Sequence, residues 1–415
     1  MFGLVMKEKK HMDNLAINGG LPVTDRPFPA WPYFDEDQIE AVNAVLQSGN
    51  VNYWTGSEVS LFEKEFAGSC GVNYAVAVMN GTAALDAALW ALNIGTGDEV
   101  IVTPRSYIAS ASCAVVRGAV PVFADVDRDS QNITADAIEK VITDRTRAVI
   151  VVHLAGCPCE MDGIVSLTKK HGIALIEDCA QSTGAFYRGR PVGSFGDAAA
   201  FSFCQDKIMT TGGEGGMVLT NNREIWSKVW SYKDHGKSFD AVFNTDIEPG
   251  PSFRWLHESF GVNLRMTEMQ AAIGRVQLRR MPGWIEIRRR NADILTKAFL
   301  KIPSLRVPVY PDHIFHSYYK YYVFIKPDQL KSGWDRDRVL SAVNAEGIPC
   351  YTGSCSEIYL EKAFATNGFG QSERLPIAKE LGETSLMFLV HPRLLEDDLR
   401  DTSKAVQKVM NAAAR

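Results

Sequence analysis

The amino-acid sequence predicts an α/β fold, a mainly parallel sheet with helices on both faces. Seven short apolar segments rich in β-branched residues follow one another, and helix-like stretches separate most of them. Continuous apolar runs are typical of strands buried on both faces, and their spacing of roughly 20–30 residues suits right-handed βαβ crossovers. The segments are residues 74–79, 99–103, 120–124, 148–152, 173–177, 198–203 and 216–220.

The helices between these strands have recognisable boundaries. Residues 80–92 are rich in Ala and Leu, begin at Asn80 and stop before Gly95. Asn is a favoured N-cap, and Gly commonly follows a helix. Residues 134–141 and 162–171 are predicted to form two more helices.

Beyond Asn263 the pattern changes. A helical region runs from Met266 to about Phe299, and Pro282 predicts a break or kink in it. Two strands (residues 318–325 and 348–351) and two helices (335–346 and 396–413) follow. We therefore expect an N-terminal arm and first helix over residues 1–50, a large domain over 51–290 and a smaller α+β domain over 291–415.

Composition limits the possible functions. The chain has 415 residues, of which 46% are hydrophobic, enough for a large core in two or three packed units. A formal net charge of -5 gives no electrostatic reason to expect nucleic acid or an anionic membrane as a partner. No apolar stretch could span a bilayer or serve as a signal peptide, so we expect a cytoplasmic protein. The Cys157-Pro-Cys159 pair lacks zinc-site spacing, and we expect no metal.

Two candidate site segments lie where strands end. Asn80-Gly81-Thr82 opens a helix, whose unpaired N–H groups and the Thr82 hydroxyl could bind a phosphate. An N-cap followed by Gly is also ordinary at a helix start. Asp178 follows a buried strand at the edge where α/β sheets bind ligands, although such acids also cap helices.

The most informative segment contains Lys207. It lies between the apolar strand 198–203 and a glycine-rich turn that enters the next strand. Burial lowers the pKa of a lysine readily, which frees the amine for Schiff-base chemistry. The alternative is a structural lysine paired with Asp206 or Glu214. No Walker phosphate-binding motif occurs.

Together the three segments match the needs of pyridoxal 5'-phosphate. A lysine binds the aldehyde, an aspartate keeps the pyridine nitrogen protonated, and a helix N-terminus holds the phosphate. Tyr107, just after a strand, is positioned to stack on the ring. The sequence therefore indicates a pyridoxal-phosphate enzyme.

At this point the sequence resembles the DegT/DnrJ/StrS-type sugar aminotransferases, pyridoxal-phosphate enzymes of fold type I with a seven-stranded sheet. The resemblance runs from about Ile17 to the C-terminus. Five blocks in the family's order carry it: Trp54-Thr-Gly56 with Phe62-Glu63, Asn80 to Leu85, Ile176 to Gln181, Phe201 to Gly216 around Lys207, and Gly261 to Met266.

The resemblance implies roles for individual residues. Lys207 would form the Schiff base and later move the proton between cofactor and substrate. The cofactor-binding residues would be Gly81, Thr82, Tyr107, Asp178, Gln181, Ser202, Lys207 and Asn263. Asn263 would reach the phosphate from a second subunit, which implies a homodimer with shared active sites. Thr55, Gly56, His153 and Lys233 are expected near the substrate. Cys204 departs from the family pattern, in which many members have His at this position.

The expected function is therefore a pyridoxal-phosphate aminotransferase. The resemblance implies glutamate or glutamine as donor and a nucleotide-linked 3- or 4-keto sugar as acceptor, for polysaccharide or glycan biosynthesis. A keto-cyclitol is the alternative acceptor, because some relatives that make aminocyclitols share a stretch like Asn18–Val23. A sugar dehydratase, which has His in place of the lysine, and a non-catalytic binding protein remain open. Arg105, Arg254 and Arg265 are candidates for the donor's carboxylate.

Overall fold

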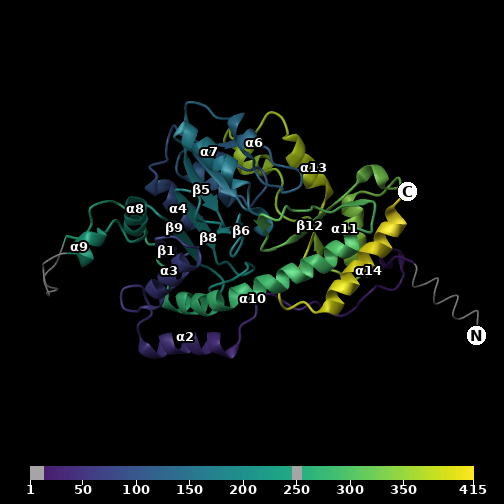
Figure 1. Cartoon of the computed structure of the whole chain (residues 1–415), viewed down its shortest axis with the longest axis horizontal. Helices are drawn as coiled ribbons and strands as arrows, with labels where there is room; N and C mark the ends of the chain where they lie inside the picture. Colours follow the sequence, from purple (N-terminus) through teal and green to yellow (C-terminus); the bar gives the residue numbers. More distant parts are fainter. Residues whose placement is uncertain (1–13, 245–254) are drawn as a thin grey trace, which may run out of the picture.

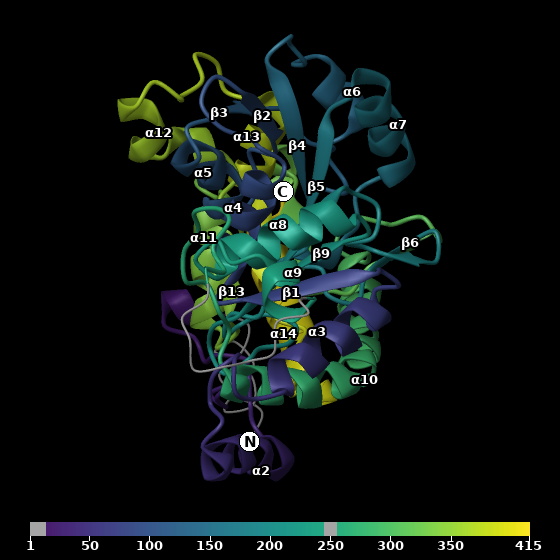
Figure 2. The same cartoon turned by 90° about the vertical axis from the view of Figure 1, so that its left-hand side faces the viewer.

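A seven-stranded sheet forms the larger half of the computed structural model, which describes residues 14–244 and 255–415 (Figures 1 and 2). Its strand order is β1-β9-β8-β5-β4-β2-β3. The strands are β1 (Tyr74–Val78), β2 (Glu99–Val102), β3 (Val120–Phe123), β4 (Thr146–Val152), β5 (Ala174–Asp178), β8 (Ala198–Ser202) and β9 (Gly216–Thr220). Each coincides with a predicted apolar segment.

The sheet is mainly parallel, as expected. The pairs from β3 through β2, β4 and β5 to β8 are parallel, whereas β9 runs antiparallel to both β8 and β1. The glycine-rich return from β8 to β9, residues 203–215, contains no helix, and β9 runs back antiparallel to β8. Lys207 lies in this return.

Helices cover both faces because alternate strand residues point to opposite sides. Val76, Ile150 and Ala200 belong to the core shared with α4 (Gly81–Ala91), α5 (Ala109–Val116) and α8 (Arg223–Lys233). On the other face, Ala199 and Met217 belong to a core with α3 (Glu58–Ser69) and α10 (Glu268–Phe299). The helices α6 (Ala135–Glu139) and α7 (Met161–His171) cover β4 and β5 on that same face.

The helix α10 corrects one expectation. It continues through Pro282 without a break and crosses the lower part of the molecule in Figure 1. Proline removes one helical hydrogen bond, at about 3 kcal/mol. Here Met281, Trp284 and Ile285 are buried around the proline, and this packing holds the helix together.

A four-stranded antiparallel sheet, in the order β10-β12-β14-β13, organises the C-terminal part. Its strands are β10 (Leu305–Arg306), β12 (Tyr321–Ile325), β13 (Cys350–Tyr351) and β14 (Ser385–Phe388). It packs with α11 (Arg336–Ala345) and α14 (Glu396–Ala413). The strand expected to begin at residue 318 begins only at Tyr321, and residues 319–320 form a bend before it. The expected division at residue 290 falls inside α10.

The remaining elements are short or peripheral. They are α2 (Glu36–Ser48), α9 (Phe239–Phe243), α12 (Lys362–Thr366), α13 (Pro376–Thr384), the small sheet of β6 (Phe186–Tyr187), β7 (Arg190–Pro191) and β11 (Ile314–Phe315), and four 3-10 turns at Ala16–Asn18, Leu154–Gly156, Pro327–Gln329 and Ile358–Leu360. Over the described ranges, no helix is both long enough and apolar enough to cross a bilayer.

Candidate active site

One cavity of about 910 Å³ brings together most of the predicted site residues. Its wall on the large sheet comes from the start of α4 and from the loops that follow β2, β5 and β8. The opposite wall comes from the C-terminal part, at residues 319–322, 353–355 and Met387. The cavity thus lies beyond the carboxyl ends of parallel strands, where α/β sheets bind their ligands.

Asp178 is a buried acid on the wall of this cavity. Its Oδ2 accepts a 2.7 Å hydrogen bond from Ser110 Oγ, and its Oδ1 accepts one of 3.1 Å from the backbone N–H of Ala180. Burial raises the pKa of Asp178, against the opposing effect of these hydrogen bonds and of the Lys207 charge. A cationic N–H donor, such as a protonated pyridine nitrogen, would compensate the buried carboxylate.

The N-terminus of α4 fits a phosphate. Asn80 caps the helix through the N–H of Ala83, at 2.8 Å. The N–H groups of Gly81 and Thr82 lie in the first turn, where a helix provides no partner for them. A Cβ on Gly81 would lie 2.7 Å from the Cβ of Ser202, so only glycine lets the helix start and the serine hydroxyl come this close. Backbone N–H groups and a hydroxyl therefore face the same end of the cavity.

Lys207 is held in the return between β8 and β9. Its carbonyl oxygen accepts a 2.9 Å hydrogen bond from Trp31 Nε1, and its Nζ lies 4.9 Å from the centroid of the Tyr319 ring. Within the described part of the chain, it forms no ion pair with Asp206 or Glu214. Asp206 instead accepts a hydrogen bond from the Tyr319 hydroxyl and pairs with Lys320. The lysine amine is thus available to a ligand. This favours Schiff-base chemistry at Lys207 over a structural ion pair with Asp206 or Glu214.

Two other predicted residues, Gln181 and Tyr107, also line the cavity, as does Cys204. Gln181 is buried, and its Oε1 accepts a 2.9 Å hydrogen bond from the N–H of Ala155. Tyr107 is 68% exposed at the cavity wall, which leaves its ring face open to a bound aromatic group. Cys204 is half-buried beside Ser202.

Asn263, Thr55 and Gly56 do not line this cavity in their own chain. Asn263 is exposed, and its side-chain oxygen accepts a hydrogen bond from the backbone N–H of Arg265. Thr55 and Gly56 border a separate hollow against α10, where a Cβ on Gly56 would collide with Glu268. A role for these three residues at the site of a second subunit stays a prediction.

The expectation of substrate contact for His153 and Lys233 needs correction, since both side chains are fully buried outside the cavity. His153 Nε2 lies 3.0 Å from Glu177, and its Nδ1 accepts a hydrogen bond from the N–H of Cys159. Lys233 Nζ lies 3.6 Å from the Tyr53 ring centroid and 3.5 Å from Glu63. A buried histidine and a buried lysine need partners, and each finds one far away in the sequence.

Sequence reasoning missed several wall residues. Ser110 lies three residues after Tyr107, and its hydroxyl was a signal in the sequence that could have pointed to it. Tyr319, Lys320 and Tyr322 belong to a segment with the composition of a core strand, so nothing in the pattern distinguished them. Ser354, Cys355 and Met387 also line the wall.

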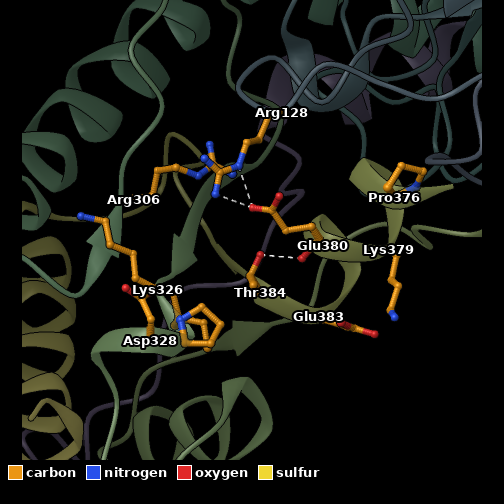
Figure 3. A pocket seen from close by; sticks show the side chains of 11 residues that line it. Arg128, Arg306, Lys326, Asp328, Pro376, Lys379, Glu380, Glu383 and Thr384 are labelled. Carbon is orange, nitrogen blue, oxygen red and sulfur yellow. Dashed lines mark hydrogen bonds and ion pairs between the residues drawn. The ribbon is translucent and has the colours of Figure 1, made fainter.

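A second hollow, of about 430 Å³, has different chemistry (Figure 3). Its two arginines pair with nearby acids: Arg128 lies 2.6 Å from Glu380, and Arg306 lies 2.6 Å from Asp129. It contains none of the predicted site residues.

Comparison with known proteins agrees with this site. Residues 32–407 match the family model described as the DegT/DnrJ/EryC1/StrS aminotransferase family. The chain belongs to this family. It is 54% identical to the aminotransferase from Psychrobacter cryohalolentis, whose X-ray structure it matches with a TM-score of 0.91 over 93% of this chain and 99% of that one.

Three other relatives have lower identity to the chain. The chain is 35% identical to the spore coat polysaccharide biosynthesis protein SpsC of Bacillus subtilis (92% of this chain, 96% of the relative). It is 34% identical to the UDP-N-acetyl-3-dehydro-alpha-D-glucosamine 3-aminotransferase of Acidithiobacillus ferrooxidans (96% and 100%). It is also 34% identical to the L-glutamine:2-deoxy-scyllo-inosose aminotransferase of Streptoalloteichus tenebrarius (96% and 97%).

Membership of this family establishes the reaction class. The DegT-family chain is a pyridoxal-phosphate-dependent aminotransferase with a fold type I architecture. Asp178, the Gly81–Ser202 contact and the free Lys207 amine fit that cofactor.

Proposed function

We propose that this enzyme transfers an amino group from glutamate or glutamine to the keto group of a nucleotide-linked sugar, at carbon 3 or 4. The observation that best supports this reaction is the position of the Lys207 amine. It lines a cavity together with buried Asp178 and the first turn of α4, whose N–H groups have no helical partner. Two neighbouring acids leave this amine unpaired, so it can act on a substrate.

Each wall residue has a separate task. Pyridoxal phosphate supplies an electron sink when bound. The first-turn N–H groups of α4 and the Ser202 hydroxyl would bind its phosphate, and Asp178 would hold a proton at its ring nitrogen. Tyr107 and Gln181 would fix the ring's position. Lys207 Nζ would move a proton from the donor carbon that bears nitrogen to the cofactor and, in the second half-reaction, from the cofactor to the acceptor carbon.

The acceptor is proposed from relatives and from the size of the cavity. One relative is named for a UDP-linked 3-keto sugar and another for spore coat polysaccharide synthesis. Ligand sites are typically about 300–1,000 Å³, and the present cavity is at the large end of that range. A large cavity suits an acceptor with an attached nucleotide. The product would be an amino sugar for a polysaccharide or glycan.

A keto-cyclitol is the second candidate, because the relative named for 2-deoxy-scyllo-inosose covers the chain as fully as the sugar-nucleotide relative does. Assay of the holoenzyme with glutamate or glutamine against keto nucleotide sugars and inososes separates the two. Turnover of inososes alone would contradict the nucleotide-sugar proposal. Loss of water from a sugar without an amino donor would indicate a dehydratase.

We further propose a homodimer with shared active sites. Asn263 is exposed next to Val262, and Phe260 nearby is 96% exposed, so an apolar surface surrounds the residue expected to reach the partner. Mixing Lys207→Ala and Asn263→Ala proteins should then restore activity, because mixed dimers contain one site with neither substitution. Mixtures no more active than the separate variants would contradict shared sites.

A further inference from the structure

An amino-acid donor brings at least one carboxylate into the cavity, and this charge needs a cationic partner. Among the described residues that line the cavity, only Lys207 and Lys320 carry a positive charge. Two of the arginines expected to meet the donor lie elsewhere: Arg105 is buried behind the wall against Tyr322, and Arg265 pairs with Asp234 at 2.7 Å. Arg254 lies outside the described residues.

Lys320 and Lys207 both lie beside the ring of Tyr319. Lys320 Nζ is 4.5 Å from the centroid of the Tyr319 ring, and Lys207 Nζ is 4.9 Å from the same centroid. One tyrosine ring therefore brings both amines into the same part of the cavity. The hydroxyl of this tyrosine donates to Asp206, which fixes the ring's orientation.

The hydrogen bonds of Lys320 leave capacity for a ligand. An ammonium group has three donors. In the described structure, Lys320 Nζ has one partner, Asp206 Oδ2 at 3.5 Å, and this oxygen already accepts from Tyr319. The lysine side chain is 20% exposed, at the cavity wall.

The charge of Lys320 is also poorly compensated. Burial lowers the pKa of Lys320, and the nearby charges of Arg288 and Lys207 lower it further, against the attraction of Asp206. An anion bound at this amine would offset both the burial and the repulsion.

We propose that Lys320 binds the α-carboxylate of the amino donor, with Asp206 and Tyr319 as positioning residues. This inference rests on the proposed function. The phosphate of a nucleotide sugar is the other source of an anion, but it is separated from the keto carbon by the sugar ring. An α-carboxylate is attached to the same carbon as the reacting nitrogen. This suits Lys320, because Lys320 and Lys207 lie beside the same Tyr319 ring.

The test uses holoenzyme variants Lys320→Met and Lys320→Arg, with Lys379→Met as control. Lys379 loses the same charge but lines the separate hollow of Figure 3. The rate of the donor half-reaction, followed by the absorbance of the cofactor, is measured against glutamate, glutamine and alanine. Binding of alanine's unreactive analogue propionate is measured by calorimetry.

For Lys320→Met we expect the half-saturating concentration of all three donors to rise about 10- to 100-fold, with a parallel loss of propionate affinity. Lys320→Arg should recover most of the loss, and Lys379→Met should match wild type. The affinity of Lys320→Met for a nucleoside diphosphate should change by less than about twofold, which is no more than an ordinary surface substitution causes.

Three results would overturn the assignment: unchanged donor saturation in Lys320→Met, an effect on glutamate alone, or a loss confined to nucleotide affinity. The last would assign Lys320 to a phosphate. A wild-type enzyme that uses these donors but aminates no sugar would refute the proposed acceptor and leave the donor test intact. A wild type that binds neither donors nor propionate would refute both.

Discussion

Ser110 Oγ donates a 2.7 Å hydrogen bond to Asp178 Oδ2, across the start of α5 and the end of β5. The serine itself contacts Ser106 Oγ at 2.9 Å. The first turn of α5 therefore orients a buried acid at the end of β5, about 70 residues further along the chain.

Ser110→Ala should weaken cofactor binding about 5- to 10-fold, because one of the two hydrogen bonds that orient Asp178 is lost. Equilibrium titration of the apoprotein with pyridoxal phosphate measures this. Ser112→Ala, on the same helix, is the control and should bind normally. Equal affinity in both variants would show that the serine does not orient the acid.

Lys207→Ala should lower turnover by at least about 10³-fold while the protein stays folded, because the acid/base group at the substrate carbon is removed. Borohydride should attach the cofactor covalently to wild type and not to the variant, as mass spectrometry would reveal. Covalent labelling at another lysine would contradict the assignment.

Gly81→Ala should reduce cofactor affinity by about 10-fold or more, because the new Cβ would lie 2.7 Å from Ser202 Cβ and push the phosphate-binding segments apart. Gly68→Ala in α3 is a matched control. Its Cβ would meet nothing within 4 Å, and the helix should gain about 0.5–1 kcal/mol of stability. Thermal unfolding and cofactor titration of both variants separate the effects.

Glu177 predicts a dependence of stability on pH. Burial favours its neutral form, but the hydrogen bonds from His153 and from the backbone N–H groups of Gly193 and Gly196 outweigh burial and lower the pKa of Glu177 below 4.5. A lowered folded-state pKa means that the carboxylate stabilises the fold above about pH 4.5, and that this contribution disappears as the pH falls through the folded-state pKa.

Glu177→Gln should therefore lower the free energy of unfolding at pH 7 by about 3 kcal/mol, since backbone donors lose a charged acceptor. Urea unfolding of wild type and variant checks this, and the difference between them should shrink as the pH falls below 4.5. A difference that is constant over this range would contradict a lowered pKa.

The sequence predicted the large sheet well because strands buried on both faces are continuous apolar runs. It also predicted that Lys207 and Asp178 lie at or just after strand ends, because these positions depend only on local order. The buried pairs His153–Glu177 and Lys233–Glu63 could not be foreseen, because burial depends on distant packing. Lys320 was missed because it precedes β12 in an apolar, aromatic segment that looks like a core strand throughout.

The helix α10 contributes Met281 and Trp284 to the core beneath the large sheet, and Leu295 and Phe299 to the core of the C-terminal part. One continuous helix thus packs in the cores behind both walls of the cavity. A cut near residue 290 would leave each fragment with unburied leucine, phenylalanine or tryptophan, so the two halves are expected to aggregate rather than fold when expressed separately.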